Sequence, residues 1–122
     1  MNSMPKLSIV IPTKNEERYL PVLLEEISKQ TVQPFEVIVA DADSTDRTRE
    51  IAEVFGAKVV AGGLPSIGRN RGASAAAGEL IFFFDADVLL RDSRFLEHAL
   101  AEFESRGFDI ATADVGVMDG TM

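Results

Sequence analysis

The chain has 122 residues, which suits a single compact domain over residues 1–122 and leaves little room for a second. Its net charge of −8 argues against a nucleic-acid partner, because binding to phosphates needs a basic surface. The sequence has no cysteine and one histidine, so a metal site would have to use oxygen ligands, which suit magnesium, manganese or calcium.

Apolar runs and helix signals alternate along the chain. Continuous apolar stretches are typical of strands buried on both faces, whereas proline at a start and glycine past an end are typical of helices. In chain order they predict a strand at 7–11, a helix from about 16 to 30, a strand at 35–40, a helix from 44 to 56, a strand at 58–61, a helix from 65 to 78, a strand at 80–84, a helix at 93–106 and a strand at 108–115.

The helix expected between residues 44 and 56 has signals at both ends. Side-chain oxygens of residues 44–46 can accept hydrogen bonds from the free amides of its N-terminus, and Gly56 is placed to end it. The apolar residues expected to pack this helix against the core are Ile51, Ala52, Val54 and Phe55.

The alternation of strands and helices predicts an α/β fold. We expect a three-layer Rossmann-like sandwich, with a mostly parallel sheet covered by helices on both faces. Ligands of such sheets bind at the carboxyl ends of the strands. Polar loops follow predicted strand ends at residues 13–17, 41–46 and 85–87, so we expect them to meet at one rim and to form the functional site.

Asp85 and Asp87 are the main candidates for chemistry. They follow a buried strand one residue apart, so their side chains face the same way if the extended geometry continues. Such a pair can hold a hard cation, which in turn neutralises a diphosphate. The alternative is a solvated acidic turn or the start of a helix, since Asp92 and Ser93 follow.

Two other segments offer groups for a ligand. Asp41, at the end of the second strand, could accept hydrogen bonds from a base or ribose. Residues 63–70 keep the glycine spacing of a phosphate-binding P-loop, but Arg69 and Asn70 replace the residues such a loop requires. Arg69 and Arg71 could still reach a phosphate from this helix, or could only offset an acidic rim.

Four segments together resemble family 2 glycosyltransferases of the GT-A fold. They read SIVIPTKNEE at 8–17, EVIVADADSTD at 36–46, GRNRGA at 68–73 and GELIFFFDAD at 78–87. Their order and spacing match the family over about residues 6–115. The chain therefore resembles the nucleotide-sugar-binding half of such an enzyme, which transfers a sugar from a UDP- or GDP-linked donor to an acceptor hydroxyl.

The resemblance also implies roles for individual residues. Asp41 would contact the base, Asp85 would lie towards the ribose and sugar, and Asp87 would be nearest to a Mn²⁺ or Mg²⁺ ion, so that both aspartates are candidate metal ligands. The other residues implied in donor binding are Pro12, Thr13, Asn15, Glu16, Arg69 and Asn70.

The sequence departs from the family pattern in two respects. Ala42 stands where many relatives have a second acid, which weakens any inference that the base is uracil. The catalytic base of the family lies on a later, acceptor-binding segment, so we expect it outside these 122 residues and assign neither Asp114 nor Asp119 to that role.

Other functions compete with this interpretation. A haloacid-dehalogenase-type phosphatase would use Asp85 as nucleophile and Asp87 as general acid. A sugar nucleotidyltransferase would need a glycine-rich loop after the first strand, and residues 12–17 contain no glycine. A non-catalytic nucleotide-sugar-binding module fits the missing acceptor half as well as a truncated enzyme does.

The sequence shows neither a signal peptide nor an apolar run near the roughly 20 residues that span a bilayer. We therefore expect a soluble, cytoplasmic chain, with membrane attachment conceivable through a longer parent protein. Apolar surface exposed by a missing half would favour homo-oligomers.

Overall fold

A parallel sheet organises the chain in the computed structural model, which describes residues 6–106, 110–112 and 116–117. The elements are β1 (Leu7–Thr13), α1 (Leu20–Ser28), β2 (Glu36–Asp41), α2 (Thr48–Val54), β3 (Lys58–Ala61), α3 (Pro65–Ala75), β4 (Leu80–Phe83), β5 (Val88–Leu89), α4 (Phe95–Arg106), β6 (Ile110–Thr112) and β7 (Gly116–Val117).

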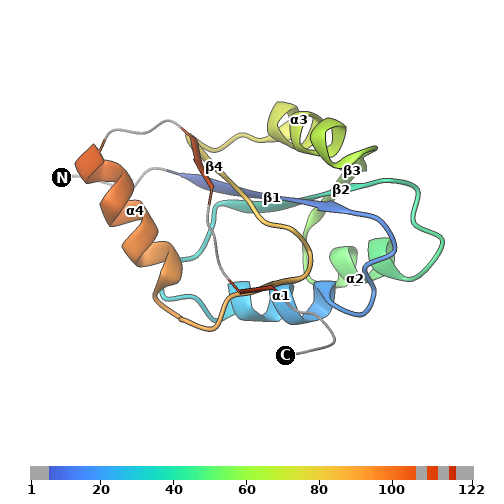
Figure 1. Ribbon diagram of the computed structural model, residues 1–122, viewed down its shortest axis with the longest axis horizontal. Helices are drawn as coiled ribbons and strands as arrows, with labels where there is room; N and C mark the ends of the chain where they lie inside the picture. Colours follow the sequence, from blue (N-terminus) through green and yellow to red (C-terminus); the bar gives the residue numbers. More distant parts are fainter. Residues whose placement is uncertain (1–5, 107–109, 113–115, 118–122) are drawn as a thin grey trace.

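The sheet has five strands in the order β3-β2-β1-β4-β6, and each neighbouring pair is parallel. The central strand β1 pairs with β2 from Ser8 to Thr13, so that Thr13 lies opposite Asp41 at the carboxyl end. β5 and β7 form a separate antiparallel pair. This register brings the loops that follow β1 and β2 to the same end of the sheet (Figure 1).

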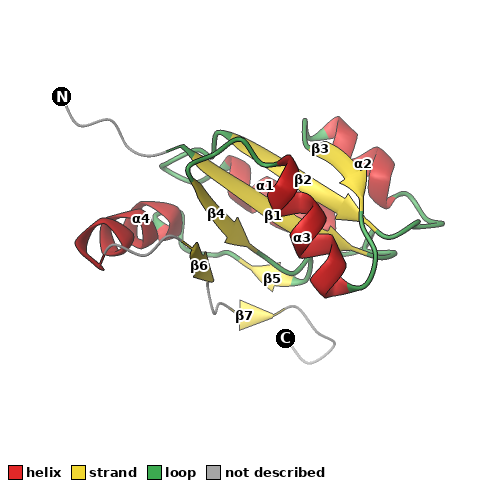
Figure 2. Ribbon diagram, turned by 90° about the horizontal axis from the view of Figure 1, so that it is seen from above, coloured by secondary structure: helices red, strands yellow, loops and turns green. Residues whose placement is uncertain are grey.

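Helices cover both faces of the sheet, as the sequence predicts. α3 lies over one face, across β1 and β2, while α1 and α2 lie on the other (Figures 1 and 2). Residues of α4 share a buried apolar cluster with α1. The predicted three-layer α/β architecture is confirmed.

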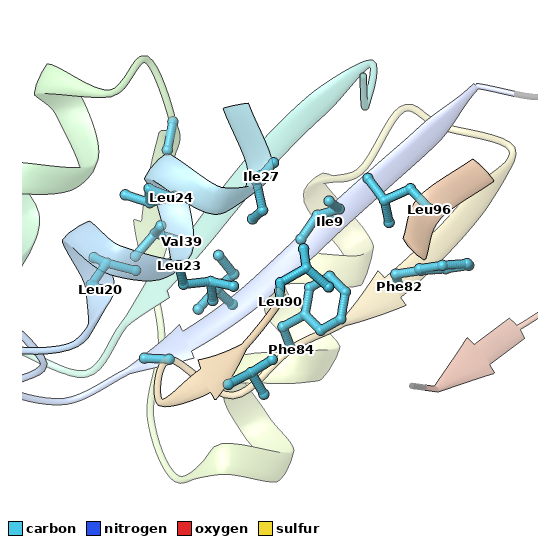
Figure 3. Packing of buried hydrophobic residues seen from close by; sticks show 14 of the residues in the cluster. Ile9, Leu20, Leu23, Leu24, Ile27, Val39, Phe82, Phe84, Leu90 and Leu96 are labelled. Atoms are coloured by element: carbon cyan, nitrogen blue, oxygen red, sulfur yellow. The ribbon is translucent and has the colours of Figure 1, made fainter. Parts of the chain in front are cut away.

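The main core lies between the sheet and α1, α2 and α4. Alternate residues of β1, such as Ile9 and Ile11, face this side, where Leu23 of α1 and Phe84 also pack (Figure 3). The rings of Phe82 and Phe84 meet edge to face with their centroids 6.5 Å apart. The apolar run of the central strand β1 is therefore buried on both faces, whereas the edge strand β3 has Lys58 and Ala61 exposed.

α3 reaches its face of the sheet through glycines. A Cβ atom added to Gly72 would stand 2.3 Å from Cγ1 of Val10, and one added to Gly68 would stand 3.2 Å from Cβ of Pro12. The two glycines are one turn apart and both buried, so this side of the helix has no side chains to hold it away from β1. The helix was predictable from Pro65, whereas its close contact with the sheet was not predicted.

The helix expected from residue 44 to 56 is shorter and less buried than predicted. It begins at Thr48, and Gly56, with φ +85°, follows its end. Val54 is 79% exposed and Phe55 is 43% exposed, so the prediction that they pack on the core is wrong. The helix has seven residues, and those it buries are Thr48 and Ala52, one turn apart on a single narrow face.

Other boundaries shift by a few residues. α1 begins at Leu20 because residues 16–19 form a turn in which the amide of Tyr19 donates to the carbonyl of Glu16. α3 ends at Ala75, since Ala76 is extended, and so Gly78 lies beyond it. The strand predicted at 108–115 is seen as β6, and its remaining residues lie outside the described part of the chain.

A buried glutamine ties α4 to the rest of the domain. The side-chain amide of Gln30 donates to the carbonyl of Asp92 (2.8 Å), and its oxygen accepts from the amide of Leu96 (3.0 Å). The amide of Thr31 also donates to the carbonyl of Ser93 (2.8 Å). These bonds cap the first turn of α4 from a loop more than 60 residues earlier in the chain.

Among the described helices, none is long and apolar enough to cross a bilayer.

Candidate functional site

The three predicted loops meet at the carboxyl edge of the sheet. Where β1 and β2 end, the amide of Ala42 donates to the carbonyl of Thr13 (2.9 Å). The loop after β4 leaves the same end of the sheet beside β1, where the amide of Phe84 donates to the carbonyl of Val10 (3.1 Å). The rim is the expected position for a ligand on a sheet of this kind.

Asp41 lies inside this rim as the centre of a hydrogen-bond network. Its Oδ1 accepts from the hydroxyls of Thr13 (2.7 Å) and Ser44 (2.6 Å). Its Oδ2 accepts from the amide of Ser44 (2.9 Å) and lies 3.6 Å from Nε of Arg49. The side chain is 1% exposed. In the described structure this carboxylate therefore binds protein groups, and its contact with a base stays a prediction.

The loops after β1 and β2 are joined along their length. The amide of Asn15 donates to the Ser44 hydroxyl (2.8 Å), and Oδ1 of Asn15 accepts from the amide of Thr45 (2.8 Å). The amide of Glu16 donates to the hydroxyl of Thr48 (2.8 Å). Asn15 adopts a positive φ of 53°, which asparagine tolerates better than most residues. The two loops thus form one unit that fixes the backbone around Asn15.

Asp46 holds the start of α2 within this unit. Its carboxylate accepts from the amide of Thr48 (2.9 Å) and from the Thr48 hydroxyl. It also accepts from the amide of Glu17 (3.2 Å). Burial raises the pKa of Asp46, but these hydrogen bonds outweigh burial and lower the pKa overall. Asp46 therefore fixes the start of α2 against the loop after β1, with its carboxylate close to the rim.

Asp85 and Asp87 lie just past β4, on a turn in which the amide of Val88 donates to the carbonyl of Asp85 (3.1 Å), so the extended geometry assumed for the pair does not continue. Phe84 and Ala86 are buried, whereas Asp85 is exposed and Asp87 is partly exposed. Burial raises the pKa of Glu16, and the charges of Asp87, Asp46 and Asp85 raise it further. The rim therefore gathers negative charge, which favours a bound cation.

Cationic and polar side chains of α3 lie beside these acids. Nη2 of Arg69 is 3.6 Å from Oδ1 of Asp85, an exposed ion pair. Asn70 is exposed one residue further on. Arg71 instead donates to the carbonyl of Gly62 (2.7 Å), so it holds the loop before α3. Of the two arginines considered for a phosphate, Arg69 is the one that the structure brings to the acids.

The acids at the rim would supply part of a metal site. In the described residues, no three acidic or histidine side chains are grouped so that they could hold a metal ion alone. Two carboxylates are, however, the protein share of many magnesium sites in which substrate phosphates complete the coordination. Asp85 and Asp87 fit that arrangement because both are accessible and lie on one short turn at the rim.

Sequence reasoning missed Arg49 and the glycines of α3. Arg49 lies outside all the polar loops that the sequence marks as strand ends, and only the fold places its guanidinium against Asp41. The spacing of Gly68 and Gly72, four residues apart in a predicted helix, could have indicated a close helix contact. Pro12, which is half-buried, packs against this glycine face.

Comparison with known proteins gives a consistent result. The model of the family described as Glycosyl transferase family 2 matches residues 8–120. A 4,4'-diaponeurosporenoate glycosyltransferase of Staphylococcus haemolyticus is 40% identical over an alignment 106 positions long, which covers 80% of this chain and 28% of that protein. Poly(ribitol-phosphate) beta-N-acetylglucosaminyltransferase TarS of Staphylococcus aureus is 36% identical, over 88% of this chain and 20% of TarS.

Solved structures share the fold. S. aureus TarS 1-349 in complex with UDP-GlcNAc superposes with a TM-score of 0.74 and 33% identity, covering 84% of this chain and 32% of that one. Glucosyl-3-phosphoglycerate synthase from Mycobacterium tuberculosis, in complex with Mn²⁺, UDP and glucosyl-3-phosphoglycerate, gives a TM-score of 0.65 and 27% identity, covering 76% and 37%. The chain spans well under half the length of these relatives.

Proposed function

The chain belongs to glycosyltransferase family 2, and we propose that it is the donor-binding part of an enzyme that transfers a sugar from a nucleoside-diphosphate sugar to an acceptor hydroxyl. The observation that carries the proposal is the position of Asp85 and Asp87, both accessible, on the turn after β4 at the carboxyl edge of the sheet, with Arg69 of α3 3.6 Å from Asp85. A phosphatase that uses Asp85 as nucleophile is not supported by this family membership.

The acids of the rim would bind the diphosphate indirectly. Asp85 and Asp87 would hold a divalent cation, Mn²⁺ or Mg²⁺, with Asp87 the nearer ligand. When bound, such a cation stabilises charge that develops on the diphosphate leaving group. Mn²⁺ is supported by the glucosyl-3-phosphoglycerate synthase structure that contains it together with UDP. Arg69, now 3.6 Å from Asp85, is close enough to turn towards a phosphate.

The nucleoside would lie over the joined loops. Pro12, Thr13, Asn15 and Asn70 would contribute to this site: Asn15 and Asn70 are exposed, Pro12 is half-buried, and the buried Thr13 would act through its hydrogen bond to Asp41. We propose uridine as the nucleoside, because both neighbouring enzymes carry UDP or a UDP-sugar in their structures. The acceptor site and the catalytic base would belong to a longer parent protein, as the greater length of the relatives suggests.

Calorimetry tests the proposal. UDP and GDP would be titrated into the wild-type chain with Mn²⁺ and again with a chelator, alongside Asp87→Asn and the control Glu53→Gln. Glu53 is exposed on α2, so its substitution removes the same charge away from the rim. We expect Mn²⁺-dependent UDP binding that Asp87→Asn weakens at least about tenfold and Glu53→Gln leaves unchanged. Absence of nucleotide binding, or equal binding by Asp87→Asn, would sink the proposal.

A further inference from the structure

Arg49 supplies a counter-charge to a buried carboxylate that faces no solvent. Asp41 has a side chain only 1% exposed, and Nε of Arg49 lies 3.6 Å from its Oδ2. Nη2 of Arg49 also donates to the carbonyl of Ser44 (3.4 Å). A buried ionised carboxylate is costly unless it is paired and hydrogen-bonded, so this guanidinium matters more than an ordinary surface cation.

The network around Asp41 carries this effect to the rim. The Ser44 hydroxyl donates to Asp41 and accepts from the amide of Asn15, so a shift of Ser44 moves both. The Thr13 hydroxyl donates to the same Asp41 oxygen as Ser44. Asn15 and Asp43 both have positive φ, at 53° and 50°. Such conformations persist when surrounding contacts fix them, and here those contacts converge on Asp41.

We propose that Arg49 is a positioning residue for nucleotide binding, which holds Asp41 and Ser44 and through them the Thr13 and Asn15 surface. The inference rests on the proposed function, because it concerns the nucleotide side of the same rim. Arg49 itself lies on α2, and its proposed role is indirect, through the 3.6 Å approach of its Nε to Asp41 and its bond to the carbonyl of Ser44. Its effect is therefore separate from that of Asp85 and Asp87, which lie on another loop.

The chain contains a matched control. Arg47, two residues earlier, pairs with Glu50 at 2.9 Å, and both side chains are exposed. The amide of Arg47 donates to the carboxylate of Glu17, a bond that does not depend on the side chain. Arg47→Ala and Arg49→Ala thus remove the same charge and a similar length of exposed side chain from neighbouring positions. They differ in whether the guanidinium faces Asp41.

The test compares wild type, Arg49→Ala, Arg49→Lys and Arg47→Ala by calorimetry with UDP in the presence of Mn²⁺. Affinity for Mn²⁺ alone and thermal unfolding are measured in parallel. Arg49→Ala should weaken UDP binding roughly three- to thirtyfold, the usual range for a residue that acts through a contact network. Arg49→Lys, which keeps the charge but cannot reach both partners, should recover part of the loss. Arg47→Ala should bind UDP as wild type does, and all four should bind Mn²⁺ alone equally.

Several results would overturn the inference. The inference fails if Arg49→Ala binds UDP as tightly as wild type, or if Arg49→Ala and Arg47→Ala lose UDP affinity equally. It also fails if Arg49→Ala loses affinity for Mn²⁺ alone together with its affinity for UDP. If Arg49→Ala does not fold, Arg49→Lys decides, and wild-type UDP affinity in that folded variant would count against the role. Wild-type protein that binds Mn²⁺ but no UDP would overturn the proposed function as well, whereas failure of the variants alone would overturn only the role of Arg49.

Discussion

Replacing Gly72 by alanine tests the close approach of α3 to the sheet. The new Cβ would stand 2.3 Å from Cγ1 of Val10, which is fully buried on the central strand β1. The contact requires a shift of about 1 Å, and overpacking of this kind costs about 1–3 kcal/mol. Alanine recovers about 1 kcal/mol of helix propensity. The net expectation is a loss of about 1 kcal/mol in the free energy of unfolding, and about 2 kcal/mol if β1 does not yield.

Denaturant unfolding of wild type, Gly72→Ala, Val10→Ala and the double mutant measures the free energy of the clash between the new Cβ atom and Val10. Val10→Ala removes the clashing methyl group, so adding Gly72→Ala to that background should be neutral or stabilising. Ser74→Ala, at an exposed position of the same helix, gives the effect of helix propensity with no contact to the sheet. The reasoning is refuted if Gly72→Ala stabilises the wild-type chain as much as Ser74→Ala does, or if the cycle shows no coupling with Val10.

Two further substitutions test other parts of the fold. Gln30→Ala should lower the free energy of unfolding by about 2 kcal/mol, because the buried amide of Leu96 loses its acceptor, and a change below about 0.5 kcal/mol in urea unfolding would contradict this. Partial burial raises the pKa of Glu36, but hydrogen bonds from the Ser8 hydroxyl and the Ala77 amide outweigh burial and lower the pKa below its ordinary 4.5. The ionised Glu36 carboxylate therefore stabilises the fold above pH 4.5, and this contribution is lost as the pH falls through the lowered pKa. Glu36→Gln lacks that contribution, so its free energy of unfolding should fall less than that of wild type between neutral and acid pH. Equal acid sensitivity of the two proteins would show that Glu36 is not the group responsible.

The strands were predictable because their signal is local. Val59, Val60 and Ala61 give β3 an apolar run after Lys58, and the sequence placed this strand at the same bounds as the structure. Helix starts were less predictable, because they depend on partners far along the chain. Ser44 looked like the start of a helix, but its hydroxyl is used by Asp41 and Asn15, so α2 begins only at Thr48.

The same distinction applies to the candidate site. The rule that ligands bind at the carboxyl ends of parallel strands was enough to place the loops that carry Glu16, Asp41 and Asp85 at one end of the sheet. The burial of Asp41 could not be predicted, because it results from contacts with Thr13, 28 residues earlier, and with Arg49 on the next helix. An apolar residue was also a poor guide to burial in a short helix. Val54, the last residue of α2, is 79% exposed, because this seven-residue helix buries only the narrow face of Thr48 and Ala52.

The central claim is that the acids after β4 bind a divalent cation together with a uridine diphosphate. Paramagnetic broadening by Mn²⁺, followed on the backbone amide signals of the isotope-labelled chain with and without UDP, tests it most directly. The account predicts broadening centred on residues 85–88 and Glu16, stronger with UDP, with the signals of Glu36 and Gly78 at the opposite edge of the sheet spared. Broadening spread evenly over exposed acids such as Glu50 and Glu53, or unaffected by UDP, would contradict it.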